Sequence, residues 1–170
     1  MKSTTLLAAL CAVAPSLALA QGAPPASSPA SSPATGVVVS VDVGGGGIAG
    51  GGTQYTPSGV FEGELGAGYE VGLGLRPELS LVLGLAPRSN FALRPGLHYD
   101  LPDLPFYVRG ALDWSTIQGS GGWRWLLAGG GGSLQLNDVL GGFAEADLGV
   151  PLQRSTGLGV LVRVGVSFRL

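Results

Sequence analysis

Side chains able to do chemistry are few in this chain. The sequence holds one histidine, His98, and one cysteine, Cys11. His98 is followed by Tyr99 and Asp100, so no serine stands two residues after it as a partner for nucleophilic chemistry. A general base must lie within hydrogen-bond reach of the proton that it takes, and the local sequence offers His98 no serine hydroxyl as the donor of that proton. We therefore interpret His98 as a structural histidine.

Carboxylates supply the other candidates. Glu145 and Asp147 are two residues apart on a predicted strand, which places their side chains roughly 7 Å apart, a spacing that could suit acid and base work. Counter-ions for Arg109 and Arg163 are the simpler interpretation. Asp100 and Asp103 flank a turn and provide too few oxygens for calcium, which takes about six to eight. We expect no catalytic residue, metal or cofactor.

Glycine-rich segments could suggest a nucleotide site. The segments 44–52 and 66–74 are followed by no lysine and by no strand-to-helix pattern, so neither resembles a phosphate-binding loop. Nucleic acid is excluded on charge, because the pI is near 5.2 and no basic run exists to neutralise phosphates.

The composition indicates a chain with little wet surface. Only 12% of residues are charged while 45% are hydrophobic, and Lys2 is the only lysine. Soluble surfaces usually contain about 25–35% charged residues. The 31 glycines and 12 prolines also disfavour helices. These numbers favour a folded β protein that faces something other than water.

Residues 36–170 alternate between apolar and polar or small residues in eight stretches, as strands do. A turn is expected at Arg76-Pro77. In the sixth stretch the apolar residues change from one face of the strand to the other, since Trp123 and Trp125 have odd numbers and Leu134 and Leu136 have even ones. A bulge within Gly129–Gly132 would explain this change. The predicted strands are Val37–Val43, Phe61–Arg76, Leu79–Leu85, Phe91–Leu101, Phe106–Ser115, Trp123–Leu136, Gly141–Leu152 and Leu158–Leu170.

Connection lengths and aromatic positions point to a membrane. Connections after strands 2, 4 and 6 are about two to four residues and the others mostly longer, reaching about fifteen in Gly45–Gly59, which is the outer-membrane barrel pattern. A soluble lipocalin-like barrel would also alternate, but the aromatic residues fall near strand ends, as membrane girdles do. These are Phe61, Phe91, Trp114, Trp123 and Trp125 at one side and Tyr99, Phe106, Phe143 and Phe168 at the other.

The fold class that follows is all-β, an eight-stranded antiparallel up-and-down transmembrane β-barrel over residues 36–170. Residues 1–20 read as a secretory signal peptide that ends in Ala18-Leu19-Ala20 and takes Cys11 with it. Residues 21–35 are a disordered linker rich in Pro, Ala and Ser.

Positions that alternate with the lipid-facing ones face the lumen, which an eight-stranded barrel fills with its own side chains. We expect a network of arginine and carboxylate pairs there, with glycines on the inner wall making room for these side chains. The predicted network is Asp42, Glu64, Glu70, Arg76, Arg94, His98, Arg109, Asp113, Glu145, Asp147 and Arg163.

The chain resembles the small eight-stranded outer-membrane barrels of the OmpA and OmpX type. Its last strand, GVLVRVGVSFRL, is similar to the C-terminal signal that barrel-assembly machinery recognises, with Val164, Val166 and Phe168 alternating and Leu170 where a final Phe is usual. The resemblance implies a monomer in the outer membrane of a Gram-negative cell, with a periplasmic linker, in contact with membrane lipid and lipopolysaccharide. OmpA-type proteins often continue into a peptidoglycan-binding domain; nothing in this sequence matches one, so we do not expect that anchoring role here.

Three functions stay open. The first is a non-catalytic barrel with a structural or surface-interaction role, for which the segment Gly44–Ser58 is the candidate display loop. The second is a narrow conduit for small or hydrophobic molecules. The third is a lipid-modifying enzyme, although the chain lacks the His-x-Ser motif of the lipid A deacylase barrels that it resembles in size.

Overall fold

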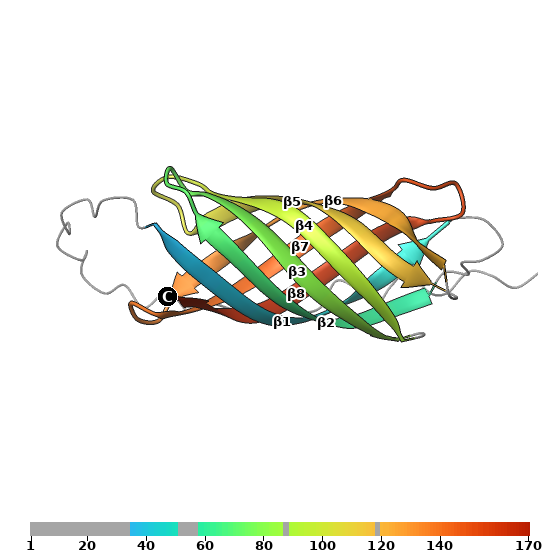
Figure 1. Cartoon of the computed structure of the whole chain (residues 1–170), viewed down its shortest axis with the longest axis horizontal. Coiled ribbons are helices and arrows are strands. Elements are labelled where there is room, and N and C mark those ends of the chain that lie inside the picture. Colours follow the sequence, from blue (N-terminus) through green and yellow to red (C-terminus); the bar gives the residue numbers. More distant parts are fainter. Residues whose placement is uncertain (1–34, 51–57, 87–88, 118–119) are drawn as a thin grey trace, which may run out of the picture. The chain divides into compact units, whose positions relative to one another are not determined.

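The computed structural model describes residues 35–50, 58–86, 89–117 and 120–170; the predicted signal peptide and all but the last residue of the predicted linker lie outside these ranges. Eight strands form the structure (Figure 1). Within the described part, no helix is long and apolar enough to cross a bilayer. The strands are β1 (Gly36–Ala49), β2 (Ser58–Glu70), β3 (Leu75–Ala86), β4 (Asn90–Asp100), β5 (Phe106–Ile117), β6 (Ser120–Gln135), β7 (Leu140–Pro151) and β8 (Leu158–Arg169).

The strands close into one antiparallel barrel in sequence order. Each strand pairs with the next, and β8 returns to pair with β1 from Val38–Arg169 to Ala49–Leu158. We call the end where β1 begins and β8 ends the terminal end, on the left in Figure 1, and the opposite end the distal end. The barrel fold predicted from the alternation is confirmed.

The two faces of the wall have opposite chemistry. On β8, Val160, Val162 and Val164 are 46%, 55% and 53% exposed, whereas Arg163 between them is 2% exposed. A strand of about 12 residues is roughly 40 Å long and spans about 28 Å at a 45° tilt, which matches a bilayer's hydrocarbon core. Apolar side chains face outward and charges inward, the reverse of a soluble protein.

The turn between β2 and β3 was predicted wrongly at Arg76-Pro77. It lies at residues 71–74, where Gly72, Leu73 and Gly74 have φ of 95°, 55° and 75°. Two glycines allow this left-handed run at little cost, while Arg76 and Pro77 pair with β4. Gly72 and Gly74 therefore belong to the turn and not to the inner wall, where the predicted strand Phe61–Arg76 would have placed them.

The prediction of long connections at one end was also wrong in part. Residues 87–89 and 118–119, which join β3 to β4 and β5 to β6, are shorter segments than the turns at 71–74, 101–105 and 136–139. The expected display loop shrinks as well, because Gly44–Ala49 continues β1 and pairs with both β2 and β8. Residues 51–57 of that loop lie outside the described residues.

A bulge in β6 lies at Arg124 rather than in Gly129–Gly132, where pairing with β5 and β7 continues without interruption. Asp113 of β5 pairs with Trp125, and the next residue, Trp114, pairs with Trp123. The extra residue turns both Arg124 and Trp125 toward the lumen, and this resolves the change of phase.

The outer aromatic positions agree with the predicted girdles except at two residues. Trp125 and Phe143 face the lumen, Trp125 because of the bulge and Phe143 because it is two residues from inward-facing Glu145. Large aromatic side chains exposed on the outer face are Phe61, Phe91 and Trp123 near the distal end, and Tyr69, Phe106 and Phe168 near the terminal end.

The bulge predicts how the tryptophans respond to lipid. In single-tryptophan variants of the barrel in vesicles, brominated lipid should quench the fluorescence of Trp123, which is 46% exposed, far more than that of Trp125, whose indole nitrogen donates to the Gly157 carbonyl at 2.9 Å. Equal quenching of the two would contradict the position of the bulge.

Some inner-wall glycines are required by close approach. A Cβ on Gly131 would lie 2.2 Å from the Ala144 carbonyl oxygen and 2.6 Å from Tyr107 Oη, whereas a Cβ on Gly110 would meet nothing nearer than 4.0 Å. Gly131→Ala should lower the free energy of unfolding in vesicles by about 1–3 kcal/mol, with Gly110→Ala as the matched control that loses little. A neutral Gly131→Ala would disprove the steric explanation.

Candidate functional site

The charged side chains of the lumen form the candidate site. All eleven predicted network residues point inward, and ten of them are at most 8% exposed; Arg76 is partly buried. They come from every strand of the barrel except β6, because inward positions recur at every second residue. The structure brings most of them into two groups, a central one and one at the terminal end.

Arg94 of β4 is the distal member of the central group. Its guanidinium donates from Nε to Asp113 at 2.8 Å and from Nη1 and Nη2 to Glu62 at 2.5 and 2.9 Å. Nη1 also donates to Glu64 at 2.8 Å. Five fixed donors suit several carboxylates at once, so this one arginine joins β2, β4 and β5.

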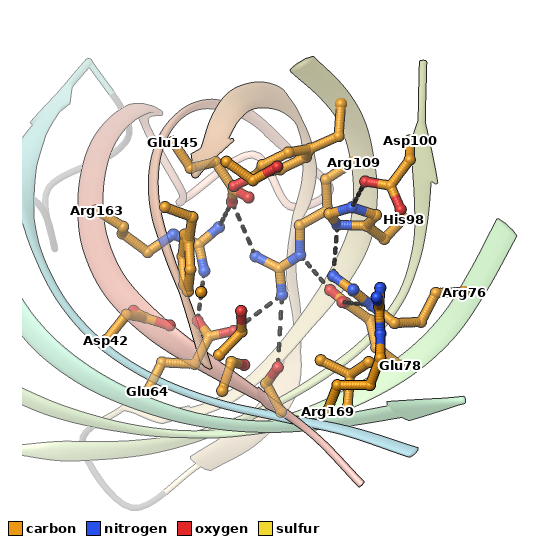
Figure 2. A pocket seen from close by; sticks show the side chains of 18 of the residues that line it. Asp42, Glu64, Arg76, Glu78, His98, Asp100, Arg109, Glu145, Arg163 and Arg169 are labelled. Carbon is orange, nitrogen blue, oxygen red and sulfur yellow. Dashed lines mark hydrogen bonds and ion pairs between the residues drawn. The ribbon is translucent and has the colours of Figure 1, made fainter. Parts of the chain in front are cut away.

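Arg109 and Arg163 form the rest of the central group (Figure 2). Arg109 donates to Glu64 at 2.8 Å and to Glu145 at 3.1 Å, and it also pairs with Glu78. Arg163 donates to Glu64 at 2.6 Å and pairs with Glu145 and Asp147. Glu145 and Asp147 thus act as counter-ions for these arginines.

The terminal group surrounds His98. Arg169 donates to Glu70 at 2.6 Å, and Arg76 lies 3.9 Å from the same carboxylate. The imidazole of His98 stacks on the Tyr107 ring at a centroid distance of 4.2 Å. Both of its nitrogens have partners, Arg76 Nη2 at 2.9 Å from Nδ1 and Asp100 Oδ1 at 2.9 Å from Nε2.

These contacts define the tautomer of His98. A guanidinium has only donors, so Nδ1 must accept from Arg76, and Nε2 then carries the proton that it donates to Asp100. With both nitrogens engaged, the ring holds Arg76 and Asp100 in place.

Sequence reasoning missed several members of the site. Glu62 and Glu78 lie on the inward phase of β2 and β3, so the alternation could have identified them. Arg124 could not be assigned without the bulge; it is 7% exposed and donates to Gln153 at 2.7 Å. Arg169 also belongs to the site but was not predicted; it lies near the end of the chain, and its side chain is only half-buried.

In the part of the chain that the structure describes, two cavities of the lumen adjoin these charged groups. The terminal cavity, of about 90 Å³, is lined largely by polar side chains and reaches from Asp42 and Glu64 to Arg169. The distal cavity, of about 40 Å³, is mainly apolar and is lined by Val60, Trp125, Leu127 and Leu161 beside Glu62 and Arg94. The two share no lining residue, and the contact between Arg94 and Glu64 lies between them.

Asp42 differs from the other central carboxylates. It is 5% exposed, lines the terminal cavity, and makes no hydrogen bond or ion pair with any residue that the structure describes. Across the described ranges, no group of three His, Cys, Asp or Glu side chains is arranged to hold a metal ion.

No protein-family model matches the chain, and no curated protein sequence matches it. Solved structures do match. A designed transmembrane β-barrel aligns with a TM-score of 0.56 at 20% identity, covering 82% of this chain and 98% of its own. Neisserial surface protein A aligns with a TM-score of 0.55 at 15% identity, covering 79% and 97%. The N-terminal β-barrel domain of Pseudomonas aeruginosa OprF gives 0.55 and 15%, covering 81% and 100%.

These likenesses establish the fold class. The chain is an eight-stranded transmembrane β-barrel with a lumen filled by its own charged side chains. Its fold is that of the small outer-membrane barrels that it was predicted to resemble.

The central group predicts unequal costs for removing arginines. Arg94→Met leaves Glu62 and Asp113 buried without this guanidinium, and it should lower the free energy of unfolding by about 3–5 kcal/mol. The control is Arg169→Met, whose side chain is 42% exposed and contacts one carboxylate, with an expected loss below about 1 kcal/mol. Urea unfolding in vesicles measures both, and similar losses would refute the assignment.

Proposed function

We propose that the chain is a non-catalytic barrel of the Gram-negative outer membrane, with a structural or surface-interaction role. The observation that carries this proposal is the continuous apolar outer face around a lumen filled by ion pairs. Such a molecule is stable only where lipid covers its outside, and its interior serves to hold the wall together.

Several features support this location and orientation. Val164, Val166, Phe168 and Leu170 are all exposed on the outer face, where barrel-assembly machinery could contact them. The two longest connections between the strands, residues 50–57 and 152–157, lie at the distal end. Outer-membrane barrels have their longer loops outside the cell, which supports a periplasmic position for the terminal end and the linker 21–35. Outer-membrane lipid and lipopolysaccharide then surround a monomer.

The lumen favours a closed barrel over a conduit. The two cavities are separate, and between them Arg94 bonds both Glu62 and Glu64. A permeant molecule would have to part at least these pairs, which costs several kcal/mol for each buried charge that is left alone.

The candidate catalytic groups are all held in hydrogen bonds or ion pairs with neighbouring side chains, which supports a non-catalytic role. His98 uses both nitrogens, and Glu145 and Asp147 are bound by arginines. A lipid-modifying enzyme would need one of these groups free to take a proton.

The distal end offers a rigid surface for interaction. Arg124 donates to Gln153, and Trp125 donates to Gly157, so the bulged residues of β6 hold both ends of the connection between β7 and β8. The Leu152 amide also donates to the Arg124 carbonyl at 2.8 Å. A loop fixed in this way can present its surface to a partner at little entropic cost.

Cell fractionation with gel electrophoresis tests the membrane assignment. The protein should occur in the outer-membrane fraction and migrate differently with and without boiling, because a closed barrel resists detergent until heated. Recovery in the soluble fraction, or identical migration, would overturn the assignment.

Two further measurements separate the three functions. Planar bilayers that contain the refolded barrel should stay electrically silent, whereas stepwise conductance would favour a conduit. Incubation with lipopolysaccharide and phospholipid should leave their masses unchanged, whereas a lost acyl chain would favour an enzyme.

A further inference from the structure

The central group contains more negative than positive groups. Its three arginines are Arg94, Arg109 and Arg163, and they contact six carboxylates, namely Glu62, Glu64, Glu78, Asp113, Glu145 and Asp147. Arg76 adds only a contact of 3.8 Å to Glu78. A buried carboxylate without a counter-charge is costly, so the excess of carboxylates must be offset either by further positive charge or by bound protons.

Asp42 is where that charge is missing. It lies on β1 directly opposite Glu64 of β2 and Gly165 of β8. In Figure 2 its carboxylate points into the lumen near Glu64, and no dashed line reaches it. Within the described residues Asp42 has no bonding partner, although it is 95% buried, being 5% exposed. The neighbouring arginines are already matched by Glu64, Glu145 and Asp147.

Two neutral oxygens line the same cavity as this carboxylate. Ser40 of β1 and Ser80 of β3 flank Gly66 of β2, and a Cβ on that glycine would lie 2.5 Å from the Ser40 hydroxyl and 3.1 Å from the Ser80 hydroxyl. Both hydroxyls therefore extend over a position that carries no side chain. The Ser80 hydroxyl also accepts from Arg109 at 3.5 Å, whereas the Ser40 hydroxyl has no side-chain partner among the described residues. Asp42, Ser40 and Ser80 all line the terminal cavity.

We propose that the terminal cavity binds a small monovalent cation, such as Na⁺ or K⁺, at Asp42 and the Ser40 hydroxyl. The volume of the cavity, about 90 Å³, is room for about three waters at roughly 30 Å³ each, enough for a partly hydrated ion. One free carboxylate with a hydroxyl suits a single charge, whereas calcium takes about six to eight oxygens and usually several carboxylates.

The ion has a route from the terminal end. The cavity is also lined by Asp100 and Arg169, whose side chains are 41% and 42% exposed. Asp100 and Glu70 balance the positive charge of Arg76 and Arg169 at this opening, so the entrance does not repel a cation. The site thus samples the solution at the terminal end.

Nuclear magnetic resonance of the refolded protein in detergent micelles at pH 7 tests the proposal. Titration with NaCl or KCl should produce a saturable shift of the Asp42 and Ser40 amide signals. N-methyl-D-glucamine chloride, whose cation is too large for the cavity, should not produce it at equal ionic strength. The carbon signal of the Asp42 carboxyl should show the ionised form when the shift saturates.

Variants and a second method make the test decisive. Asp42→Asn, nearly identical in shape, should lose the shift, whereas Asp103→Asn, which removes a carboxylate at an exposed turn, should keep it. An equal response to N-methyl-D-glucamine, a shift retained in Asp42→Asn, or an Asp42 carboxyl that stays protonated throughout would overturn the proposal. Should Asp42→Asn fail to fold, anomalous scattering from wild-type crystals grown in RbCl decides, since absence of a peak beside Asp42 would also overturn it.

Discussion

The carboxylate of Glu64 is the point on which the interior depends. Guanidiniums from β4, β5 and β8 converge on this one group of β2, with contacts of 2.8, 2.8 and 2.6 Å. None of those strands is a neighbour of β2 in the sheet. The hydrogen bonds of the wall join only adjacent strands, so this group adds connections across the lumen. Buried ion pairs seldom exceed apolar packing in stability, but their directional bonds fix how distant strands face one another.

The glycines of the inner wall are needed because the lumen is filled by large charged side chains. A large guanidinium needs space beside its own backbone, and glycines on adjacent strands provide that space. A Cβ on Gly44 would lie 2.5 Å from Cγ of Arg163, with which it pairs, and one on Gly68 would lie 2.8 Å from Cγ of Arg76. The unusual composition of the chain is therefore partly a requirement of its charged side chains.

The fold and most of the site could be predicted because one periodicity controls both. Every second residue faces lipid, and that pattern alone identifies Arg94, Arg109 and Arg163 as inward. The alternation could not predict the positions where it is interrupted by a bulge or a turn. The bulge at Arg124 depends on how β6 pairs with β5. The turn at 71–74 depends on glycines in the left-handed conformation, but a proline is a stronger sign of a turn in the local sequence, so the turn was predicted at Pro77 instead. Asp42 was assigned correctly to the lumen phase, but its lack of a partner depends on where three arginines point.

The separation of the two cavities has an electrical consequence. Arg94 lines the distal cavity and Glu64 the terminal one, and their hydrogen bond of 2.8 Å lies between the two. A unit charge moved through a full drop of 100 mV changes in energy by about 2.3 kcal/mol. Leaving one partner of a buried ion pair alone costs about 3–5 kcal/mol. A membrane potential of about 100 mV is therefore too small to part this arginine from its carboxylates.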